Sequence, residues 1–267
     1  MQGKTEELVY MLLWTCDMLT RPTFRNLTDS FESWAYRQGL QRQLAKLEQQ
    51  KFLESRPAGG DDPCRFDRVF RLTEAGRLHA LGGRDPEARG HRRWDGHWRL
   101  VLFDLPNAQS SLRNRLRNQL RCLGFGWLQN SVWISPDPLE TEKASLADNR
   151  IDVESLIVLQ ARPCAGESDD EIVAGAWDFK RIKQLYVEHG RILAAHPTGE
   201  LRGESAARAL QKWAAQERLA WLAAVTEDPL LPEALLPLGY RGREAWQKRV
   251  AAMKAIVSLV RSFEPKY

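Results

Sequence analysis

Apolar residues recur at spacings of three and four along the first fifty residues, which is the pattern of amphipathic helices. A first helix is predicted from one apolar stripe that contains Leu8, Met11, Leu12, Thr15 and Leu19. A short second helix is expected near residues 26–31, and a third helix from about residue 34 to residue 50. The inward stripe of the third helix consists of Leu40, Leu44 and Leu47.

The pattern then changes to two short strands that are joined by a loop. Residues 52–56 read FLESR, residues 68–77 read RVFRLTEAGR, and a glycine-containing loop separates them. Thr73 stands where its side chain can cap a helix that follows the second strand. Three helices followed by a hairpin are the order of a winged helix-turn-helix, which we predict for residues 1–83.

The central part of the chain alternates between strand and helix patterns. A continuous apolar run at residues 100–103 predicts a buried strand, and leucines at helical spacing predict a helix over residues 107–126. Strand residues follow at 127–135, where a tight hairpin is expected to bend at Asn130, and again at 153–163, with a helix between them. The order β-α-β(β)-α-β predicts a ferredoxin-like domain.

Polar stretches mark the domain boundaries. The segment GGRDPEARGHRR is polar and basic without periodicity, which predicts a linker at residues 84–93 and places the ferredoxin-like domain at residues 94–166. Residues 167–267 begin with an acidic loop and are otherwise expected to be helical, with long helices at 177–196, 205–225 and 242–263. The predicted fold class is therefore α+β, with a winged helix-turn-helix, a ferredoxin-like domain and a helical C-terminal domain.

Composition narrows the class of protein. The chain has 267 residues, of which 43% are hydrophobic and 28% are charged, as is typical of a globular protein with two or three domains. The sequence contains no apolar run of about 18 residues, so no membrane span is predicted. The N-terminus lacks the basic segment of a signal peptide and the cysteines form no C-x-x-C motif, so we expect a cytoplasmic protein.

Motifs that carry enzymatic chemistry are missing from the sequence. It contains no G-x-S-x-G, no H-E-x-x-H and no phosphate-binding loop. The run ESDDE clusters carboxylates in a loop that is expected to be exposed and solvated. No pair with ligand spacing occurs among His79, His91, His97, His189 and His196. We therefore expect neither an enzyme nor a bound cofactor.

One carboxylate leaves two interpretations open. Asp104 ends the strand in WDGHWRLVLFDLP. It can be a metal ligand, with the second carboxylate supplied by its symmetry mate in a dimer, although hydrolysis also needs an oriented water and an open coordination site. It can instead cap the helix that starts near Ala108 or accept hydrogen bonds from loop amides. The structural role is favoured, because no second reactive group has catalytic spacing.

Candidate DNA-binding residues lie on the third helix and the hairpin. Glutamine can bond adenine edges and arginine can bond guanine edges in the major groove. The polar face of the third helix carries Gln38, Gln41, Arg42 and Lys46. Basic residues that can contact phosphates flank the hairpin loop at Arg56, Arg65 and Arg68. A polar helix beside a basic wing predicts that the protein binds double-stranded DNA.

A second basic segment is ambiguous. From Asp104 to Asp137 the sequence has no acid, and the helix between them carries Arg113, Arg115, Arg117 and Arg121. A local basic face can contact nucleic acid even when the net charge is only +4. For this helix alone, a solvated surface is the favoured interpretation.

Four segments resemble one protein family. RWDGHWRLVLFDLP, LGFGWLQNSVWISP, AWDF and DPLLPEALLPLGYRG are similar to the PaaX family of phenylacetate-degradation repressors, and the resemblance covers almost the whole chain in the same order. It implies a winged helix, a central ferredoxin-like domain and a helical C-terminal domain. It also implies a dimeric repressor that is released by an aryl-acyl-CoA. The third helix is rich in glutamine here, where the family usually carries arginine.

The central block also resembles the small CRISPR-associated ferredoxin-like protein of spacer acquisition, through LFDLP and LQNSVWI. That resemblance aligns Asp104 with an aspartate that is a metal ligand there. It keeps a metal-dependent nuclease as one alternative function. A nucleic-acid-binding adaptor without effector control is another.

Our main prediction is a cytoplasmic, homodimeric transcriptional regulator that represses a catabolic operon. Its expected effector is an acyl-CoA. An apolar pocket between the central and C-terminal blocks is expected to accept the aryl group, with arginines nearby for the coenzyme phosphates.

Overall fold

The computed structural model describes residues 40–57, 68–104, 110–139, 156–197 and 203–261. The chain divides into two compact units, one formed by residues 1–85, 188–222 and 244–267 and the other by residues 86–187 and 223–243. The first two predicted helices and the tip of the hairpin, together with Gln38 and Arg65, lie outside the described residues.

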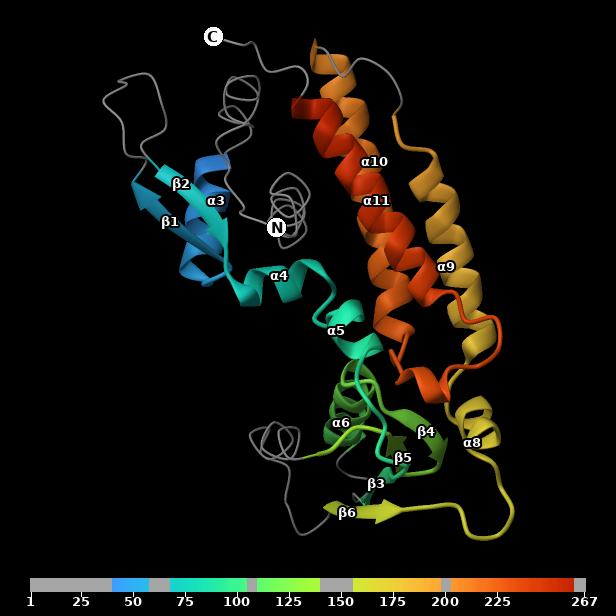
Figure 1. The fold of residues 1–267 in the computed structure, drawn as a ribbon. Helices are drawn as coiled ribbons and strands as arrows, with labels where there is room; N and C mark the ends of the chain where they lie inside the picture. The colour runs from blue at the N-terminus through green and yellow to red at the C-terminus, as the bar shows by residue number, and fades with distance from the viewer. Residues whose placement is uncertain (1–39, 58–67, 105–109, 140–155, 198–202, 262–267) are drawn as a thin grey trace. The chain divides into compact units, whose positions relative to one another are not determined.

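The N-terminal part consists of a helix, a two-stranded hairpin and a second helix (Figure 1). These elements are α3 (Leu40–Gln49), β1 (Leu53–Pro57), β2 (Arg68–Leu72) and α4 (Glu74–Ala80). The strands pair antiparallel, and Leu44, Leu47 and Leu53 are buried. This order agrees with the predicted third helix, hairpin and capped helix. The complete winged helix-turn-helix stays a prediction, because its other helices fall outside the described residues.

Thr73 caps α4, as its position in the sequence predicts. Its Oγ1 accepts a hydrogen bond from the Gly76 amide at 3.0 Å and donates one to the Lys51 carbonyl at 2.6 Å. Gly76 allows a close approach here, because a Cβ at this position would lie 2.1 Å from the Phe52 carbonyl oxygen. The base of the hairpin is therefore held against the first turn of α4.

A short helix, α5 (Pro86–Gly90), lies within the segment that was predicted to be a linker. Proline suits the first position of a helix because its missing amide hydrogen is not needed there. Glu87 stands in the first turn, where a carboxylate meets the positive end of the helix dipole. The segment between the N-terminal elements and the central sheet is thus partly helical.

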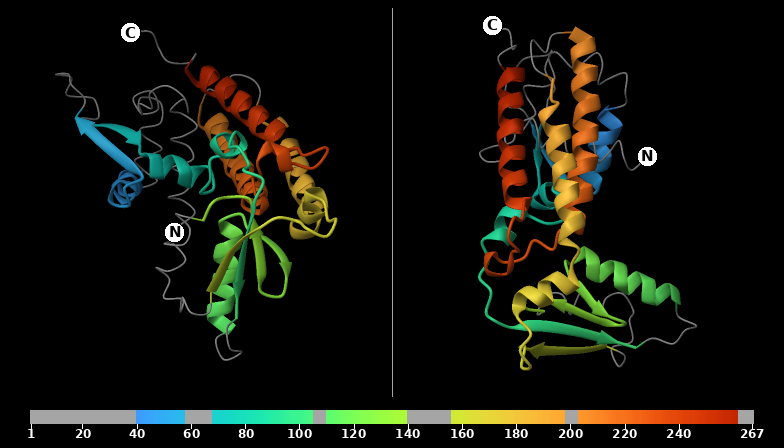
Figure 2. Two further views of the ribbon diagram at one scale, coloured as in Figure 1. Left: turned by 60° about the horizontal axis from the view of Figure 1, so that its bottom comes forward. Right: turned by 90° about the vertical axis from the view of Figure 1, so that its right-hand side faces the viewer.

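The central domain has a four-stranded antiparallel sheet in the order β4-β5-β3-β6. β3 (Trp98–Phe103) leads through α6 (Ser110–Cys122) to β4 (Gly126–Gln129) and β5 (Val132–Ser135), and β6 (Leu156–Ala161) follows. β5 lies between β3 and β4, so the β-α-β unit is split, as in the predicted ferredoxin-like fold. Figure 2 shows β6 beside β3.

Two turns of this domain have the geometry that their residues predict. Gly124 follows α6 with a φ of 91°, and the Phe125 amide donates to the Leu120 carbonyl at 2.9 Å. This is the glycine stop of a helix C-terminus. Asn130, between β4 and β5, has a φ of 45°, which confirms the bend expected there.

The two faces of the sheet pack against different parts of the chain. Val101 and Phe103 point toward α6 and its buried Leu116 and Leu120. On the other face, one cluster joins Trp98, Ile134, Val173, Ala176, Trp177, Leu231 and Leu235. The second face is therefore completed by residues from the C-terminal part of the chain.

The acidic run ESDDE that follows β6 forms part of a loop and also the first turn of a helix. α8 (Asp169–Ala176) begins there, and Ser168 and Glu171 form a reciprocal capping box. Asp169 accepts a hydrogen bond from Trp98 Nε1 at 2.7 Å. Asp170 and Glu171 are exposed, as predicted, but their carboxylates occupy the first turn of a helix and not a loop.

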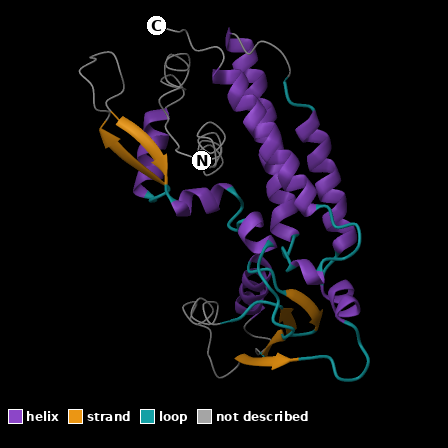
Figure 3. Cartoon of the chain, viewed as in Figure 1, coloured by secondary structure: helices purple, strands orange, loops and turns teal. Residues whose placement is uncertain are grey.

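Three long helices form most of the C-terminal part (Figure 3). They are α9 (Phe179–Ala194), α10 (Gly203–Glu227) and α11 (Gly242–Arg261), with a 3-10 turn, η4 (Glu233–Leu235), before the last. All three helices were predicted. No helix in the described part of the chain is long and apolar enough to span a membrane.

A buried polar cluster connects the three helices. His189 of α9, Glu217 of α10 and Arg249 of α11 are each at most 1% exposed. Glu217 Oε1 lies 2.8 Å from His189 Nε2 and accepts a hydrogen bond from Arg249 Nε at 2.7 Å. The Arg249 guanidinium also lies over the ring of Trp221, 4.7 Å from its centroid. One carboxylate thus ties the helices together, and burial together with Arg249 lowers the pKa of His189 to about 4.

Candidate functional site

The candidate DNA-binding residues that the structure describes lie on α3 and on the hairpin. α3 carries Gln41, Arg42 and the partly exposed Lys46. Arg56 of β1 and Arg68 of β2 occupy adjacent positions of the strand register, at the end of the hairpin next to its loop. The hairpin therefore places the backbones of these two residues, twelve positions apart in the sequence, at neighbouring positions of the register.

Side-chain contacts hold this N-terminal framework. Ser55 of β1 donates a hydrogen bond to Glu48 of α3, which links the helix to the hairpin. The rings of Phe52 and His79 stack with centroids 4.5 Å apart, which links the hairpin to α4. Contacts of these kinds limit how far the helix and the strands can move relative to each other.

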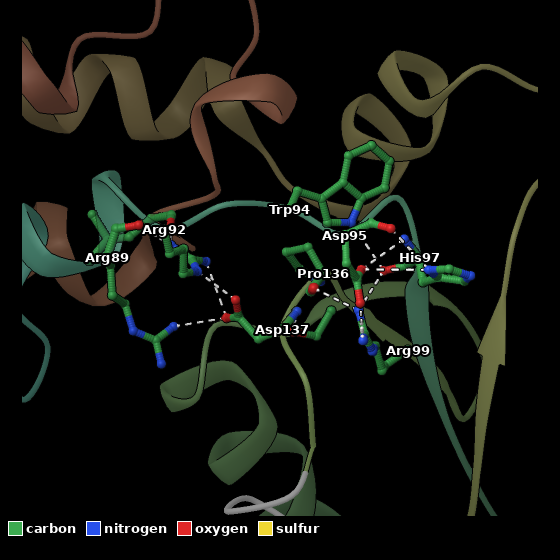
Figure 4. Close-up of polar contacts among 10 residues, drawn as sticks. Arg89, Arg92, Trp94, Asp95, His97, Arg99, Pro136 and Asp137 are labelled. Atoms are coloured by element: carbon green, nitrogen blue, oxygen red, sulfur yellow. Dashed lines mark hydrogen bonds and ion pairs between the residues drawn. The ribbon is translucent and has the colours of Figure 1, made fainter.

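Two arginines converge on one carboxylate of the central domain (Figure 4). Asp137 follows β5 and binds Arg89 at 3.2 Å and Arg92 through both of its oxygens, at 2.5 and 3.1 Å. The side chain of Asp137 is 15% exposed, and bidentate pairs of this kind are among the stronger charge-assisted hydrogen bonds. Arg92 also donates to the backbone carbonyls of Arg89 and Leu230. One guanidinium therefore joins three segments of the chain.

The loop that contains Leu230 is strained and held at several points. Leu230 has a φ of 51°, a conformation that costs a non-glycine residue about 1–3 kcal/mol. The buried Asp228 accepts its amide hydrogen at 2.8 Å. The other oxygen of Asp228 accepts the hydroxyls of Tyr186 and Tyr240, each at 2.6 Å. Asp228 thus binds both ends of the segment 228–240.

A second ion pair lies at the start of β3 and is also drawn in Figure 4. Asp95 binds the Arg99 guanidinium at 2.8 and 2.5 Å and accepts the amide of His97 at 3.0 Å. Arg99 also donates to the carbonyl of Pro136 at 3.1 Å. The Arg99 guanidinium is the main cause that lowers the pKa of Asp95 to about 2. These contacts fasten the turn before β3 to the end of β5.

Asp104 lies at the opposite end of β3 and is exposed. The residues that separate it from α6 are outside the described part of the chain, so its predicted capping contact is not tested. Among the described residues, no group of three histidine, cysteine or acidic side chains is arranged to hold a metal ion.

The arginines of α6 are partly engaged within the domain. Arg121 lies over the Trp133 ring, 5.5 Å from its centroid. Arg117 reaches the carbonyl of Asn130 at 3.5 Å. Both contacts lie within the central domain.

A hollow of about 710 Å³ lies between α8 and the segment that follows η4. Its walls include Trp127, Trp177, Phe179, Leu236 and Leu238. Its charged lining residues are Asp170, Asp178 and Lys180, so a lysine is present where arginines were expected. The expected pocket was apolar, whereas this hollow combines aromatic walls with three charged lining residues.

The sheet order and its two covering layers define an α+β protein with a ferredoxin-like central domain. Residues 91–173 match the family model described as the PaaX protein central Cas2-like domain. The match confirms the resemblance that the sequence motifs carried.

Among solved structures, the uncharacterized protein Rv0674 from Mycobacterium tuberculosis is similar to this chain with a TM-score of 0.52 and 18% identity. The similarity covers 95% of this chain and 89% of that one. At this identity the likeness shows the fold alone. No curated protein sequence matches the chain.

Sequence reasoning missed the contacts around Arg92 and Asp228. The segment with Arg89 and Arg92 was interpreted as a linker. The signal that was present in the sequence is the proline-rich stretch DPLLPEALLP, whose Asp228 binds the backbone two residues later. The partners Asp137 and Leu230 of Arg92, and the partner Tyr186 of Asp228, lie more than forty positions away and leave no local pattern.

Proposed function

We propose that this protein is a DNA-binding transcriptional regulator, and specifically a repressor of a catabolic operon. The match of residues 91–173 to the PaaX central domain is the observation that carries the proposal, because the PaaX resemblance implies a repressor. The helix, hairpin and helix at residues 40–80 support a winged-helix DNA-binding domain. The polar residues of α3 read bases, and the arginines of the hairpin contact phosphates.

The test compares specific and random DNA. Arg42→Ala is expected to weaken binding to the true operator by about 1–3 kcal/mol and to random DNA by less. Arg68→Ala is expected to weaken both alike and to reduce the dependence of binding on salt. The operator is first found by sequencing genomic fragments that the protein retains, and affinities are then measured by fluorescence anisotropy.

Gln49→Ala serves as the matched control, because Gln49 is exposed at the last position of α3. It is expected to leave both affinities unchanged. Equal losses on operator and random DNA for Arg42→Ala would exclude base reading by this residue. Gln38→Ala and Gln41→Ala extend the same comparison to the predicted adenine contacts.

The proposed effector is an aryl-acyl-CoA that lowers the affinity for DNA. Trp127, Trp177 and Phe179 provide aromatic walls for the aryl group in the hollow, and Lys180 provides a cation for a phosphate. Linkage requires that DNA lower the affinity for the thioester by the same factor. Titration of phenylacetyl-CoA into the operator complex tests this, and no release at millimolar thioester would remove the effector from the proposal.

The active form is proposed to be a homodimer on a roughly palindromic operator, since symmetric dimers match symmetric half-sites. Light scattering is expected to give about twice the chain mass of 30.6 kDa, and the operator complex is expected to hold two chains. A monomer that binds the operator with full affinity would contradict this assignment.

The alternative function is a metal-dependent nuclease that uses Asp104. Its support is the Cas2-like description of the matching family model. Labelled DNA and RNA are incubated with the protein and Mg²⁺, Mn²⁺ or chelator. Metal-dependent cleavage that disappears in Asp104→Asn would replace the regulator with the nuclease. We expect no cleavage by the wild type or by Asp104→Asn.

If the protein binds DNA but binds no thioester, the remaining function is a nucleic-acid-binding adaptor without effector control.

A further inference from the structure

The loop formed by residues 228–240 connects the hollow to Arg92. Leu236 and Leu238, near the middle of the loop, line the hollow. At the start of the loop, the strained Leu230 has its amide held by Asp228 and its carbonyl held by Arg92. A change at the hollow therefore acts on a segment whose far end is tied to the guanidinium of Arg92.

The walls of the hollow and the start of this loop also share one apolar core. Val173, Ala176 and Trp177 line the hollow and pack in the same cluster as Leu231 and Leu235. Close-packed interiors transmit displacements because they have little free volume. Movement of α8 around an occupant is thus expected to displace Leu231, which directly follows the strained residue.

Arg92 contacts this loop and follows α5 in the sequence, so it connects the loop to the N-terminal elements along the chain. Its other contacts are Asp137 and the last turn of α5. α5 follows directly on Asp85, which binds Arg77 of α4 at 2.7 Å. The polypeptide therefore runs from the Arg92 junction into α4 through a segment that is held at both ends.

The geometry points to Arg92 as the residue that couples occupancy of the hollow to DNA binding. The inference rests on the proposed function and names how its effector acts. In the ligand-free protein, the Arg92–Leu230 contact stabilises the conformation that binds DNA. An aryl thioester in the hollow favours the conformation in which this contact is broken. The strained backbone of Leu230 lowers the cost of that change, because breaking the contact lets the residue relax.

The test measures DNA affinity and thioester affinity separately in Arg92→Ala, with phenylacetyl-CoA as the probe. Loss of the contact is expected to weaken operator binding by about fivefold or more and to strengthen thioester binding in the absence of DNA. A merely structural role of Arg92 would weaken both. Arg92→Lys keeps a charge near Asp137 but cannot make all of these bonds, so it should fall between the wild type and Arg92→Ala.

Arg93→Ala is the matched control, because Arg93 is the exposed neighbour with the same charge. It is expected to behave as the wild type in both measurements. Unchanged operator binding in Arg92→Ala, or parallel loss of both affinities, would overturn the coupling role. If phenylacetyl-CoA does not bind the wild-type protein, the proposed effector is wrong. In that case operator affinity alone tests the role of Arg92: Arg92→Ala must weaken operator binding while its melting temperature stays unchanged.

Discussion

Individual polar residues in this chain divide into those with local partners and those with distant ones. Thr73 binds the amide of Gly76 three positions away, and the sequence alone predicted this cap. Gly124 and Asn130 likewise have the backbone conformations that their residue types favour. Asp137 binds two arginines more than forty positions away, and no local pattern indicates these contacts. Local chemistry can be predicted from sequence, whereas distant pairing depends on the tertiary fold.

The same division applies to the candidate functional residues. The candidates on α3 were chosen from helical periodicity, which is a local signal. The contacts of Arg92 could not be chosen in this way, because the segment around it has no periodicity and its partners come from two distant loops.

At the scale of the residue, Asp95 gives a prediction about acid stability. Hydrogen bonding to Arg99 is the first cause that lowers its pKa from 3.8 to about 2. A lowered carboxylate pKa stabilises the fold above about pH 4, and this contribution is lost as the pH falls toward 2. The side chain is 48% exposed, so we expect less than about 1 kcal/mol.

Thermal unfolding followed by circular dichroism between pH 5 and pH 2 tests this. Asp95→Asn should lower the melting temperature slightly at pH 5 and should converge with the wild type near pH 2. Glu167→Gln, at an exposed position before α8, controls for the change in net charge. A constant difference between Asp95→Asn and wild type across this range would contradict the assigned ion pair.

At the scale of the element, the strands and long helices within the described residues follow their hydrophobic patterns closely. β3, β6 and the three long C-terminal helices lie where the sequence predicted them. The short elements α5 and α8 were read as linker and loop, because five to eight residues carry too little periodicity. Their positions depend on contacts such as the hydrogen bond from Trp98 to Asp169.

The packing of β4 against α8 predicts opposite effects for two glycines. A Cβ at Gly126 would lie 2.6 Å from both Ala176 and Trp177, whereas a Cβ at Gly175 would meet nothing within 4 Å. Gly126→Ala should therefore destabilise the fold by about 1–3 kcal/mol. Gly175→Ala, within the helix, should be neutral or stabilise by up to about 1 kcal/mol. Urea unfolding measures both, and similar effects of the two substitutions would be inconsistent with this packing.

The cluster that joins the three long helices predicts a non-additive effect. Loss of one member leaves a buried charge without this partner, so Glu217→Leu should cost about 3–5 kcal/mol. Arg249→Met should cost a similar amount. The double substitution removes both charges and should cost less than either single one. Additive losses in urea unfolding would show that Glu217 and Arg249 do not form a coupled pair.

At the scale of the whole molecule, sequence similarity and packing define different units. The family model ends at residue 173, whereas the compact unit that contains the sheet also includes residues 223–243. Leu231 and Leu235 from that second segment are buried against Trp98 and Ile134. Hydrophobic periodicity along the chain gives no sign of such a discontinuous unit, because the segment is separated from the sheet by two long helices.

A fragment of residues 91–173 is therefore expected to be incomplete. It would expose the face of Trp98 and Ile134, and exposed apolar patches of this kind promote aggregation. We expect low solubility and binding of a hydrophobic dye, in contrast to the full chain. A soluble monomeric fragment with a cooperative unfolding transition would show that residues 223–243 are not needed for the core.

The discontinuous core also restricts how related sequences can be recombined. A chimera that exchanges only the central segment with a homologue pairs one parent's Trp98 and Ile134 with the other parent's Leu231 and Leu235. Exchange of residues 86–187 together with residues 223–243 keeps these partners, and Arg92 with the Leu230 carbonyl, from one parent. Crossover points that respect this pairing allow the unit with the central sheet to be exchanged between relatives without rebuilding its interior.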